Sequence, residues 1–351
     1  MSFWRGRPVL VTGGSGFIGA NLVEALLGLG ARVRVADNLE RGRLDSIAAW
    51  LDRIEFVPAD LLEREACRKA CEGIDTVFHL ASRVGAISYY GEHPASVLAE
   101  NCAIDANVLM AAARAGVARY VYASSVFVYP AGLQRDPEAP ALKEAQAYPA
   151  DPPNAYGWAK LFGEKLLDCA VREHPGLRGA ALRLIGVYGP HQSFDLERGS
   201  ILPVLVYRAI QYPQLQPFAI RGSGLETRSY CYVSDVVRAM LTAAEKLDGS
   251  RLLGPLNIGS ETSIRIIDLA KEVVSLSGKE IEIVLTPAET PVWGQAVDCS
   301  EARRLLDGWA PAVPLRDGLR RVYDDIAARL AAPEQRTLPE VGIRPRRIPA
   351  P

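Results

Sequence analysis

The first half of the chain alternates between two hydrophobic periods, and this alternation restricts the possible folds more than any other feature of the sequence. Short apolar runs typical of strands lie at residues 8–12, 31–37, 54–60, 75–82, 118–124 and 179–185. Segments with the spacing of amphipathic helices lie between most of them, at residues 17–29, 61–73, 93–116 and 154–174. Strands that alternate with helices predict an α/β fold in which a doubly wound parallel sheet carries helices on both faces.

The second half of the chain is less regular and indicates a smaller lobe. Proline and glycine become frequent after about residue 188, and a strand–helix unit at 229–247 indicates a return to the first domain. We expect a main domain of residues 1–185 plus about 229–250, and a mixed α/β lobe of about 186–228 and 251–331. The proline-rich last residues, 332–351, are expected to form a flexible tail.

Composition excludes several classes of function. The 351 residues are 49% hydrophobic with a net charge of −1, which gives no electrostatic reason to expect a nucleic acid or a membrane as partner. No apolar stretch approaches the roughly 18 residues of a membrane span. Cys67 and Cys71 lie one helical turn apart, but no histidine or further cysteine keeps metal-ligand spacing with them. We therefore expect no metal site, and reduced thiols in a cytoplasmic protein.

A glycine-rich loop follows the first predicted strand and opens the first predicted helix. Residues 12–19 read TGGSGFIG, with glycines at 13, 16 and 19. Because glycines lack Cβ atoms, the loop can turn tightly and a pyrophosphate can approach its backbone, while the helix N-terminus supplies N–H groups and a positive dipole. In this strand–loop–helix context, the glycines predict a dinucleotide-binding domain of the Rossmann type.

The second predicted strand ends in an acidic residue that bears on the choice of cofactor. Asp37 follows Gly19 by eighteen residues. A carboxylate there would accept hydrogen bonds from a ribose 2′-hydroxyl and repel a 2′-phosphate, which favours NAD over NADP. The alternative is a turn or capping role for Asp37, and Arg41 nearby weakens the exclusion of NADP.

A tyrosine and a lysine share one face of the helix predicted at 154–174. Tyr156 and Lys160 are four residues apart in the segment NAYGWAKLFGE. A free phenol has a pKa near 10, too high for a base at neutral pH, but an ammonium group beside it favours the phenolate. The pair is therefore a candidate general base with its tuning group.

Further motifs complete an ordered set. After TGGSGFIG come DN at 37–38, AD at 59–60, HLAS at 79–82, Asn101, ASSVFVY at 123–129, YGWAK at 156–160, LRLIGVYGP at 182–190 and GSGLETRSYCYVSD at 222–235. In this order they resemble the extended short-chain dehydrogenase/reductase family, whose core is the NAD-dependent nucleotide-sugar epimerases and dehydratases. The resemblance covers nearly the whole chain except the tail. It implies a seven-stranded sheet with a small nucleotide-sugar lobe, NAD as cofactor, a UDP- or GDP-sugar as substrate, and a homodimer formed through helices 93–116 and 154–174.

The resemblance also implies roles for individual residues. The catalytic set is Ser125, which hydrogen-bonds the sugar oxygen, Tyr156, which takes the proton of the C4 hydroxyl, and Lys160, which tunes the phenol and binds the nicotinamide ribose. The implied NAD contacts are Gly13, Gly16, Phe17, Ile18, Gly19, Asp37, Asn38, Arg41, Asp60, Leu61, Leu80, Ala81, Ser82, Asn101, Ser124, Tyr156, Lys160 and Ile185. The implied substrate contacts are Val84, Gly85, Ser125, Tyr156, Gly186, Ser200, Arg228 and Trp293.

Phe127 separates the branches of this family. Sugar 4,6-dehydratases carry an Asp-Glu pair where this chain has Val126 and Phe127, and nucleotide-sugar decarboxylases usually place glutamate at the position of Phe127. The local sequence is similar to that of GDP-mannose 3,5-epimerase and GDP-fucose synthase. Those enzymes use a cysteine at the position of Phe127 and a histidine or lysine at the position of Ser200 or Ile201. Both members of that acid/base pair are missing here.

The remaining chemistry needs only Ser125, Tyr156, Lys160 and NAD, and it is 4-epimerisation of a nucleotide hexose. An NAD(P)H-dependent 4-keto-sugar reductase, which would use the same residues, or a 3,5-epimerase-like enzyme is the alternative, and a catalytically idle NAD-binding scaffold is the alternative outside enzymes. Two departures from the family pattern concern the substrate. Gly186 stands where asparagine is usual and Trp293 where an arginine is expected, so more of the diphosphate is left to Arg228.

Overall fold

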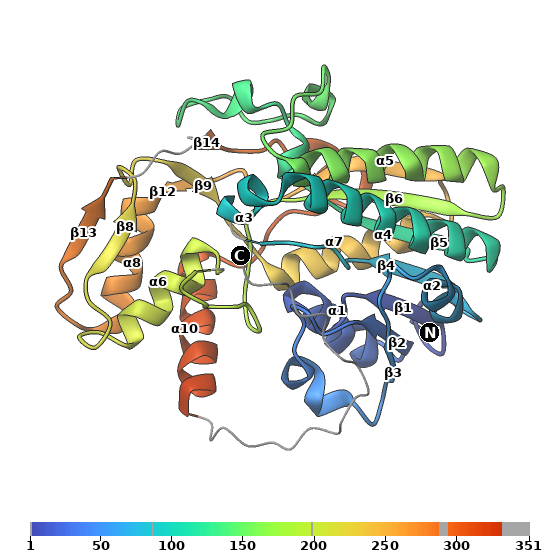
Figure 1. Ribbon diagram of the computed structural model, residues 1–351, viewed down its shortest axis with the longest axis horizontal. Coiled ribbons are helices and arrows are strands. Elements are labelled where there is room, and N and C mark those ends of the chain that lie inside the picture. Colours follow the sequence, from blue (N-terminus) through green and yellow to red (C-terminus); the bar gives the residue numbers. More distant parts are fainter. Residues whose placement is uncertain (1, 86, 198, 288–293, 332–351) are drawn as a thin grey trace.

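The computed structural model describes residues 2–85, 87–197, 199–287 and 294–331. Trp293 and the expected tail at 332–351 therefore lie outside the described residues. Seven strands form the central sheet (Figure 1): β1 (Pro8–Thr12), β2 (Arg32–Asp37), β3 (Glu55–Pro58), β4 (Thr76–His79), β5 (Arg119–Ser125), β6 (Arg178–Leu184) and β11 (Leu252–Ile258). Their order is β3-β2-β1-β4-β5-β6-β11 and every pairing is parallel, which confirms the predicted α/β class with a doubly wound Rossmann sheet.

The seventh strand corrects one sequence-based assignment. Residues from 251 onward are assigned above to the smaller lobe, but β11 pairs with β6 and forms an edge of the main sheet. Its register shifts between Leu253 and Leu256, around Gly254 and Pro255. Such an irregularity interrupts the hydrophobic pattern by which a strand is found in a sequence.

Helices cover both faces of this sheet. One face carries α1 (Phe17–Gly28) and α7 (Val233–Lys246), and the other carries α2 (Arg64–Cys71), α4 (Pro94–Arg114) and α5 (Ala155–Glu173) (Figure 1). Side chains of β1 divide between the two cores, because successive residues of a strand point to opposite faces. Val9 and Val11 belong to the core beneath α1 and α7, and Leu10 to the core beneath α4 and α5.

The smaller lobe is built mostly from the C-terminal half. Its strands are β8 (Phe218–Arg221), β9 (Thr227–Ser229), β12 (Ser263–Arg265), β13 (Ile283–Thr286) and β14 (Gly294–Gln295), and a parallel pair joins β7 (Val187–Tyr188) to β10 (Cys231–Tyr232). Its helices include α6 (Ile201–Ile210), α8 (Ile266–Ser277) and α10 (Leu315–Ala331), while α9 (Ser300–Leu305), between α8 and α10 in the chain, contacts β11 of the main sheet. Neither α6 nor the short α3 (Ile87–Glu92) is predicted by the sequence pattern.

The topology fixes where a ligand site can lie. In a parallel sheet the carboxyl ends of all strands lie at one edge, and the strand order reverses between β1 and β4. The glycine-rich loop follows β1, Asp37 ends β2, the HLAS segment follows β4, and Ser125 ends β5. The predicted site residues of the first domain therefore gather at the edge where ligands bind in open α/β sheets.

Candidate active site

The glycine-rich loop has the geometry of a phosphate cradle. Gly13 has a φ of +69°, and a Cβ atom there would lie 2.9 Å from the backbone of Ala81. A Cβ at Gly19 would lie 2.3 Å from the carbonyl oxygen of Gly13. Helix α1 starts at Phe17, and no side chain caps it at Gly16, so its first-turn N–H groups face the loop without a side-chain acceptor. These features fit a pyrophosphate, because the backbone is accessible and the helix N-terminus favours an anion.

Asp37 lies against this loop. One carboxylate oxygen accepts the N–H of Ser15 at 3.0 Å, and the other accepts the N–H of Leu39 at 2.8 Å. Burial raises the pKa of Asp37, and the two backbone hydrogen bonds oppose that shift. Asn38 closes the following turn by accepting the N–H of Glu40. The carboxylate is thus held in a fixed orientation at the end of β2.

The segment after β4 is tied to α4 through Asn101. The Asn101 side-chain oxygen accepts the hydroxyl of Ser82 at 2.7 Å and the N–H of Arg83 at 2.7 Å, while its amide nitrogen donates to the carbonyl groups of Arg83 and Val97. Leu80 and Ala81 lie between the Asn101 hydrogen bonds and the glycine loop, and both donate N–H groups to the Thr12 hydroxyl. Asp60, followed by Leu61, accepts the N–H of Leu62 at 3.0 Å after β3, and Arg41 is exposed.

Helix α5 presents Tyr156 and Lys160 to the interior. The helix starts after Asn154, whose side-chain oxygen caps the N–H of Gly157 at 2.9 Å. Lys160 is only 2% exposed, and its Nζ lies 5.5 Å from the centroid of the Tyr156 ring. Burial lowers the pKa of Lys160, and the carboxylates of Asp105 and Glu164 oppose that shift. Burial raises the pKa of Tyr156, and a hydrogen bond with Ser82 opposes it. A phenolate in this place depends on nearby positive charge, which Lys160 can supply.

The Ser125 segment packs directly against the start of α5. A Cβ atom at Gly157 would lie 2.0 Å from the carbonyl oxygen of Phe127, so only glycine permits this approach. Ser125 accepts the N–H of Phe127 at 3.3 Å, and Ser124 donates to Glu164 at 2.5 Å. The structure therefore brings the predicted serine, tyrosine and lysine together on touching elements.

Aromatic rings surround Tyr156. The ring of Tyr90 stacks on that of Tyr156 with 5.2 Å between centroids and 9° between planes. Phe127 meets both rings edge-on, at 6.2 Å from each. Tyr90 was not predicted from the sequence, and no motif marks it. Together Tyr90 and Phe127 form an apolar wall beside the candidate base.

The predicted substrate residues lie on separate segments. Gly85 donates its N–H to the Tyr90 hydroxyl at 3.3 Å, next to Val84. Gly186, after the buried Ile185, has a φ of +55°, and a Cβ there would lie 1.8 Å from the carbonyl oxygen of Ser229. This close contact explains why glycine replaces the usual asparagine.

Arg228 and Ser200 belong to the smaller lobe. Arg228 lies on β9, is partly buried, and donates to the carbonyl of Thr227 at 2.8 Å. Burial lowers the pKa of its guanidinium, and the neighbouring Tyr230 and Glu226 oppose that shift. Ser200 caps no backbone group of α6 and instead accepts a hydrogen bond from Gln192 at 2.9 Å.

Sequence reasoning missed two carboxylates beside the candidate base. Glu164 forms a buried pair with Arg183, with bonds of 2.8 and 2.7 Å. Asp105 accepts hydrogen bonds from His79 at 3.0 Å and Tyr122 at 2.6 Å. A signal was present for each, because Glu164 follows Lys160 by four residues and Asp105 follows Asn101 by four, so each continues a buried helical face.

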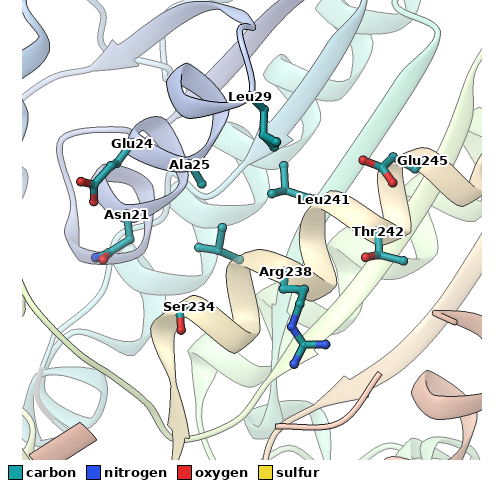
Figure 2. Close-up of a pocket in the computed structure, with 10 residues that line it drawn as sticks. Asn21, Glu24, Ala25, Leu29, Ser234, Arg238, Leu241, Thr242 and Glu245 are labelled. Carbon is teal, nitrogen blue, oxygen red and sulfur yellow. The ribbon is translucent and has the colours of Figure 1, made fainter. Parts of the chain in front are cut away.

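A groove of about 500 Å³ between α1 and α7 lies apart from these residues (Figure 2). Its labelled lining residues are Asn21, Glu24, Ala25, Leu29, Ser234, Arg238, Leu241, Thr242 and Glu245. None of them is a predicted site residue.

In the part of the chain that the structure describes, no group of histidine, cysteine and acidic side chains is placed to hold a metal ion. Across the same residues, no helix combines the length and apolar character that crossing a membrane requires.

Comparison with known proteins identifies the family. Residues 9–259 match the model of the NAD dependent epimerase/dehydratase family, and the chain belongs to that family. It is 31% identical over 315 residues to GDP-mannose 3,5-epimerase of Arabidopsis thaliana, which covers 90% of this chain and 81% of that protein. It is 31% identical over 323 residues to dTDP-4-dehydro-6-deoxy-D-allose reductase of a Streptomyces species, which covers 90% and 95%. The solved structure of UDP-glucose 4-epimerase from Thermotoga maritima with UDP-glucose matches with a TM-score of 0.82 at 28% identity, over 92% of this chain and 99% of that one.

Membership confirms the resemblance found in the motifs and NAD as the cofactor. It makes the chain a member of an enzyme family that acts on nucleotide sugars. The relatives include a 3,5-epimerase, a reductase and a 4-epimerase, so the reaction has to be inferred from the site residues.

Proposed function

We propose that this protein is an NAD-dependent nucleotide-sugar 4-epimerase. The observation that carries the proposal is the contact between α5, which bears Tyr156 and Lys160, and the segment after Ser125, with Phe127 packed edge-on against Tyr156. This arrangement holds a base, its tuning cation and a hydroxyl partner, and Phe127 cannot move a proton. Neither Val126 nor Phe127 supplies the extra proton donor that elimination or inversion next to a ketone requires.

Each of the three residues has a defined role. Tyr156 takes the proton of the sugar C4 hydroxyl and later returns one to the C4 oxygen. Lys160 stabilises the phenolate and binds the nicotinamide ribose, and Ser125 donates a hydrogen bond to the sugar oxygen. NAD, when bound, supplies the acceptor and donor of the hydride that leaves and returns to C4. The sugar must turn over between the two halves of the reaction, so that its opposite face meets the cofactor.

The substrate is a UDP- or GDP-hexose under this proposal. Arg228 provides the charge that a diphosphate needs, since a guanidinium can make two parallel hydrogen bonds to phosphate oxygens. Val84, Gly85, Gly186, Ser200 and Trp293 are the other proposed substrate contacts. The Thermotoga maritima 4-epimerase, whose structure holds UDP-glucose, supports the UDP alternative.

Replacement of the proposed base tests the proposal. Tyr156→Phe removes the phenolic oxygen and keeps the ring, so we expect turnover to fall at least about 100-fold, the lower end of what a general base contributes. NAD binding should be retained. The matched control is Tyr148→Phe, because Tyr148 is 59% exposed and outside the site. Steady-state turnover on a panel of UDP-, GDP-, dTDP- and CDP-hexoses is the measurement, and full activity in Tyr156→Phe would refute the proposal.

A 4-keto-sugar reductase is the second candidate, favoured by the 31% identity to the Streptomyces reductase. It would use the same Ser125, Tyr156 and Lys160 but would stop after one hydride delivery. Consumption of one NAD(P)H per product formed from a 4-keto sugar would establish it. Turnover without net consumption of NAD(P)H would exclude it.

We also propose that the protein is a cytoplasmic homodimer formed through α4 and α5. Three large apolar side chains on these helices are solvent-exposed in the single chain, namely Leu98 (38%), Trp158 (43%) and Phe162 (41%). An exposed group of this kind is typical of an association surface.

A further inference from the structure

A chain of four buried side chains runs from the glycine loop to α4. Thr12 accepts the N–H groups of Leu80 and Ala81, so its hydroxyl proton points to His79 Nδ1, 2.7 Å away. His79 Nδ1 is then the acceptor nitrogen, and Nε2–H donates to Asp105 at 3.0 Å. Tyr122 donates its hydroxyl to the other Asp105 oxygen at 2.6 Å.

This order of donors requires Asp105 to be ionised. Both of its oxygens act as acceptors, and only a carboxylate accepts at both without needing an acceptor of its own. The two partners are neutral. Burial lowers the pKa of His79 and raises the pKa of Tyr122 far above its ordinary value. Among the described residues no lysine or arginine forms an ion pair with Asp105, so the hydrogen-bonded chain holds a negative charge at this residue, which is 3% exposed, without a cation in direct contact.

Lys160 is a buried cation that interacts electrostatically with Asp105. Its Nζ lies 4.8 Å from the centroid of the Tyr122 ring, whose hydroxyl contacts Asp105. Gly163, three residues after Lys160, makes this approach possible, because a Cβ there would lie 2.2 Å from the Tyr122 hydroxyl and 2.7 Å from Asp105 Oδ2. The other carboxylate near Lys160, Glu164, is already paired with Arg183 by two hydrogen bonds.

The remaining titratable groups around Asp105 carry no positive charge. They are Cys102 on α4, His79 on β4, Tyr120 and Tyr122 on β5, and Tyr156 on α5. Buried charges in proteins are stable only when paired, so the charges of Asp105 and Lys160 depend on each other.

We infer that Asp105 is a positioning residue, whose fixed negative charge keeps the Lys160 side chain in its ammonium form beside Tyr156. The inference rests on the proposed role of Lys160 in binding the nicotinamide ribose. The hydrogen bonds also fix the orientation of the Asp105 carboxylate. His79, itself held by Thr12, fixes one oxygen, and Tyr122 fixes the other.

Binding of NADH as a function of pH tests this inference without any sugar substrate. Affinity is measured by fluorescence titration from pH 6 to pH 10 in the wild type, Asp105→Asn, Tyr122→Phe and Lys160→Met. Asp105→Asn keeps the shape and removes the charge, so the alkaline loss of affinity should begin at a pH at least about one unit lower than in the wild type. Tyr122→Phe removes one hydrogen bond and keeps the carboxylate, so its alkaline loss should begin where that of the wild type does.

The outcomes distinguish the role of Asp105 from the role of Lys160. A wild-type pH profile in Asp105→Asn, or an equal shift in Tyr122→Phe, overturns the inference. Lys160→Met should show no alkaline loss in this range, and a wild-type profile in that variant would overturn the role of Lys160 itself. If Asp105→Asn does not fold, Asp105→Ser, which leaves space rather than an amide, is measured in the same way.

Discussion

At the scale of single residues, two glycines on α5 set how closely the catalytic elements approach one another. Gly157 admits the carbonyl of Phe127, and Gly163 admits the Tyr122 hydroxyl and Asp105. A side chain at Gly157 would push the helix away from the Phe127 segment that follows β5, and one at Gly163 would push it away from β5 and α4. The position of Lys160 beside Tyr122 thus depends on the absence of a side chain at Gly163.

Gly163→Ala should therefore destabilise the protein, although alanine is the better helix former. The new methyl group meets Tyr122 and Asp105 in a packed interior, and we expect a loss of about 1–3 kcal/mol in the free energy of unfolding. Urea denaturation measures this value. Gly28→Ala is the control, because a Cβ at Gly28 meets nothing within 4 Å and should leave stability unchanged or raise it by up to about 1 kcal/mol. Equal behaviour of both variants would contradict the packing account.

Asp37 should decide between the two dinucleotides. Its carboxylate is fixed at the end of β2 and would repel a 2′-phosphate, so NAD should raise the melting temperature and NADP should not. At 100 times the dissociation constant, NAD binding adds about 2.7 kcal/mol of stability. Asp37→Asn removes the repulsion and should make the two shifts similar. Equal shifts by NAD and NADP in the wild type would show that Arg41 outweighs Asp37.

At the scale of elements, α5 has two faces with different tasks. Tyr156, Lys160 and Glu164, spaced by four residues, point into the protein. Trp158 and Phe162 lie on the exposed side of the same helix. An association surface on α5 would therefore be supported by the same helix that carries the catalytic pair.

Charges placed on the exposed side of α5 should separate the proposed dimer. In the double variant Trp158→Glu and Phe162→Glu, two carboxylates would face their copies across the interface, so the molar mass from light scattering should fall from dimer to monomer. Leu225→Glu is the control, since Leu225 is 50% exposed but lies between β8 and β9 in the smaller lobe. A wild-type protein that is already monomeric would contradict the proposed assembly.

At the scale of the whole molecule, the main domain was predictable because its helices and strands have long, regular apolar periods and ordered motifs. Several elements of the second half were not, and two of them show why. Strand β11 carries an irregular register around Gly254 and Pro255, and α6 has Pro203 in its first turn. Proline is tolerated there because first-turn N–H groups have no partner within the helix, but in a sequence it suggests an interruption.

The residues of the candidate site were predictable only where they lie within a local sequence motif. The loop, Asp37, Ser125, Tyr156 and Lys160 all lie in local motifs. Asp105 acquires its partners from β4 and β5, so only the packed sheet brings the three elements together. Acidic residues in helices are mostly solvent-exposed, so the four-residue spacing from Asn101 does not by itself show that Asp105 is buried.

Proton NMR of a turnover reaction in D₂O tests the central claim most directly. The protein is incubated with UDP-, GDP-, dTDP- and CDP-hexoses, without added NAD(P)H, and the products are examined at C3, C4 and C5. Because the proposed reaction moves a hydride from C4 to the cofactor and back, the account predicts inversion at C4 and no deuterium at C3, C4 or C5. Deuterium at C3 or C5, or the absence of C4 inversion with every sugar, would contradict it.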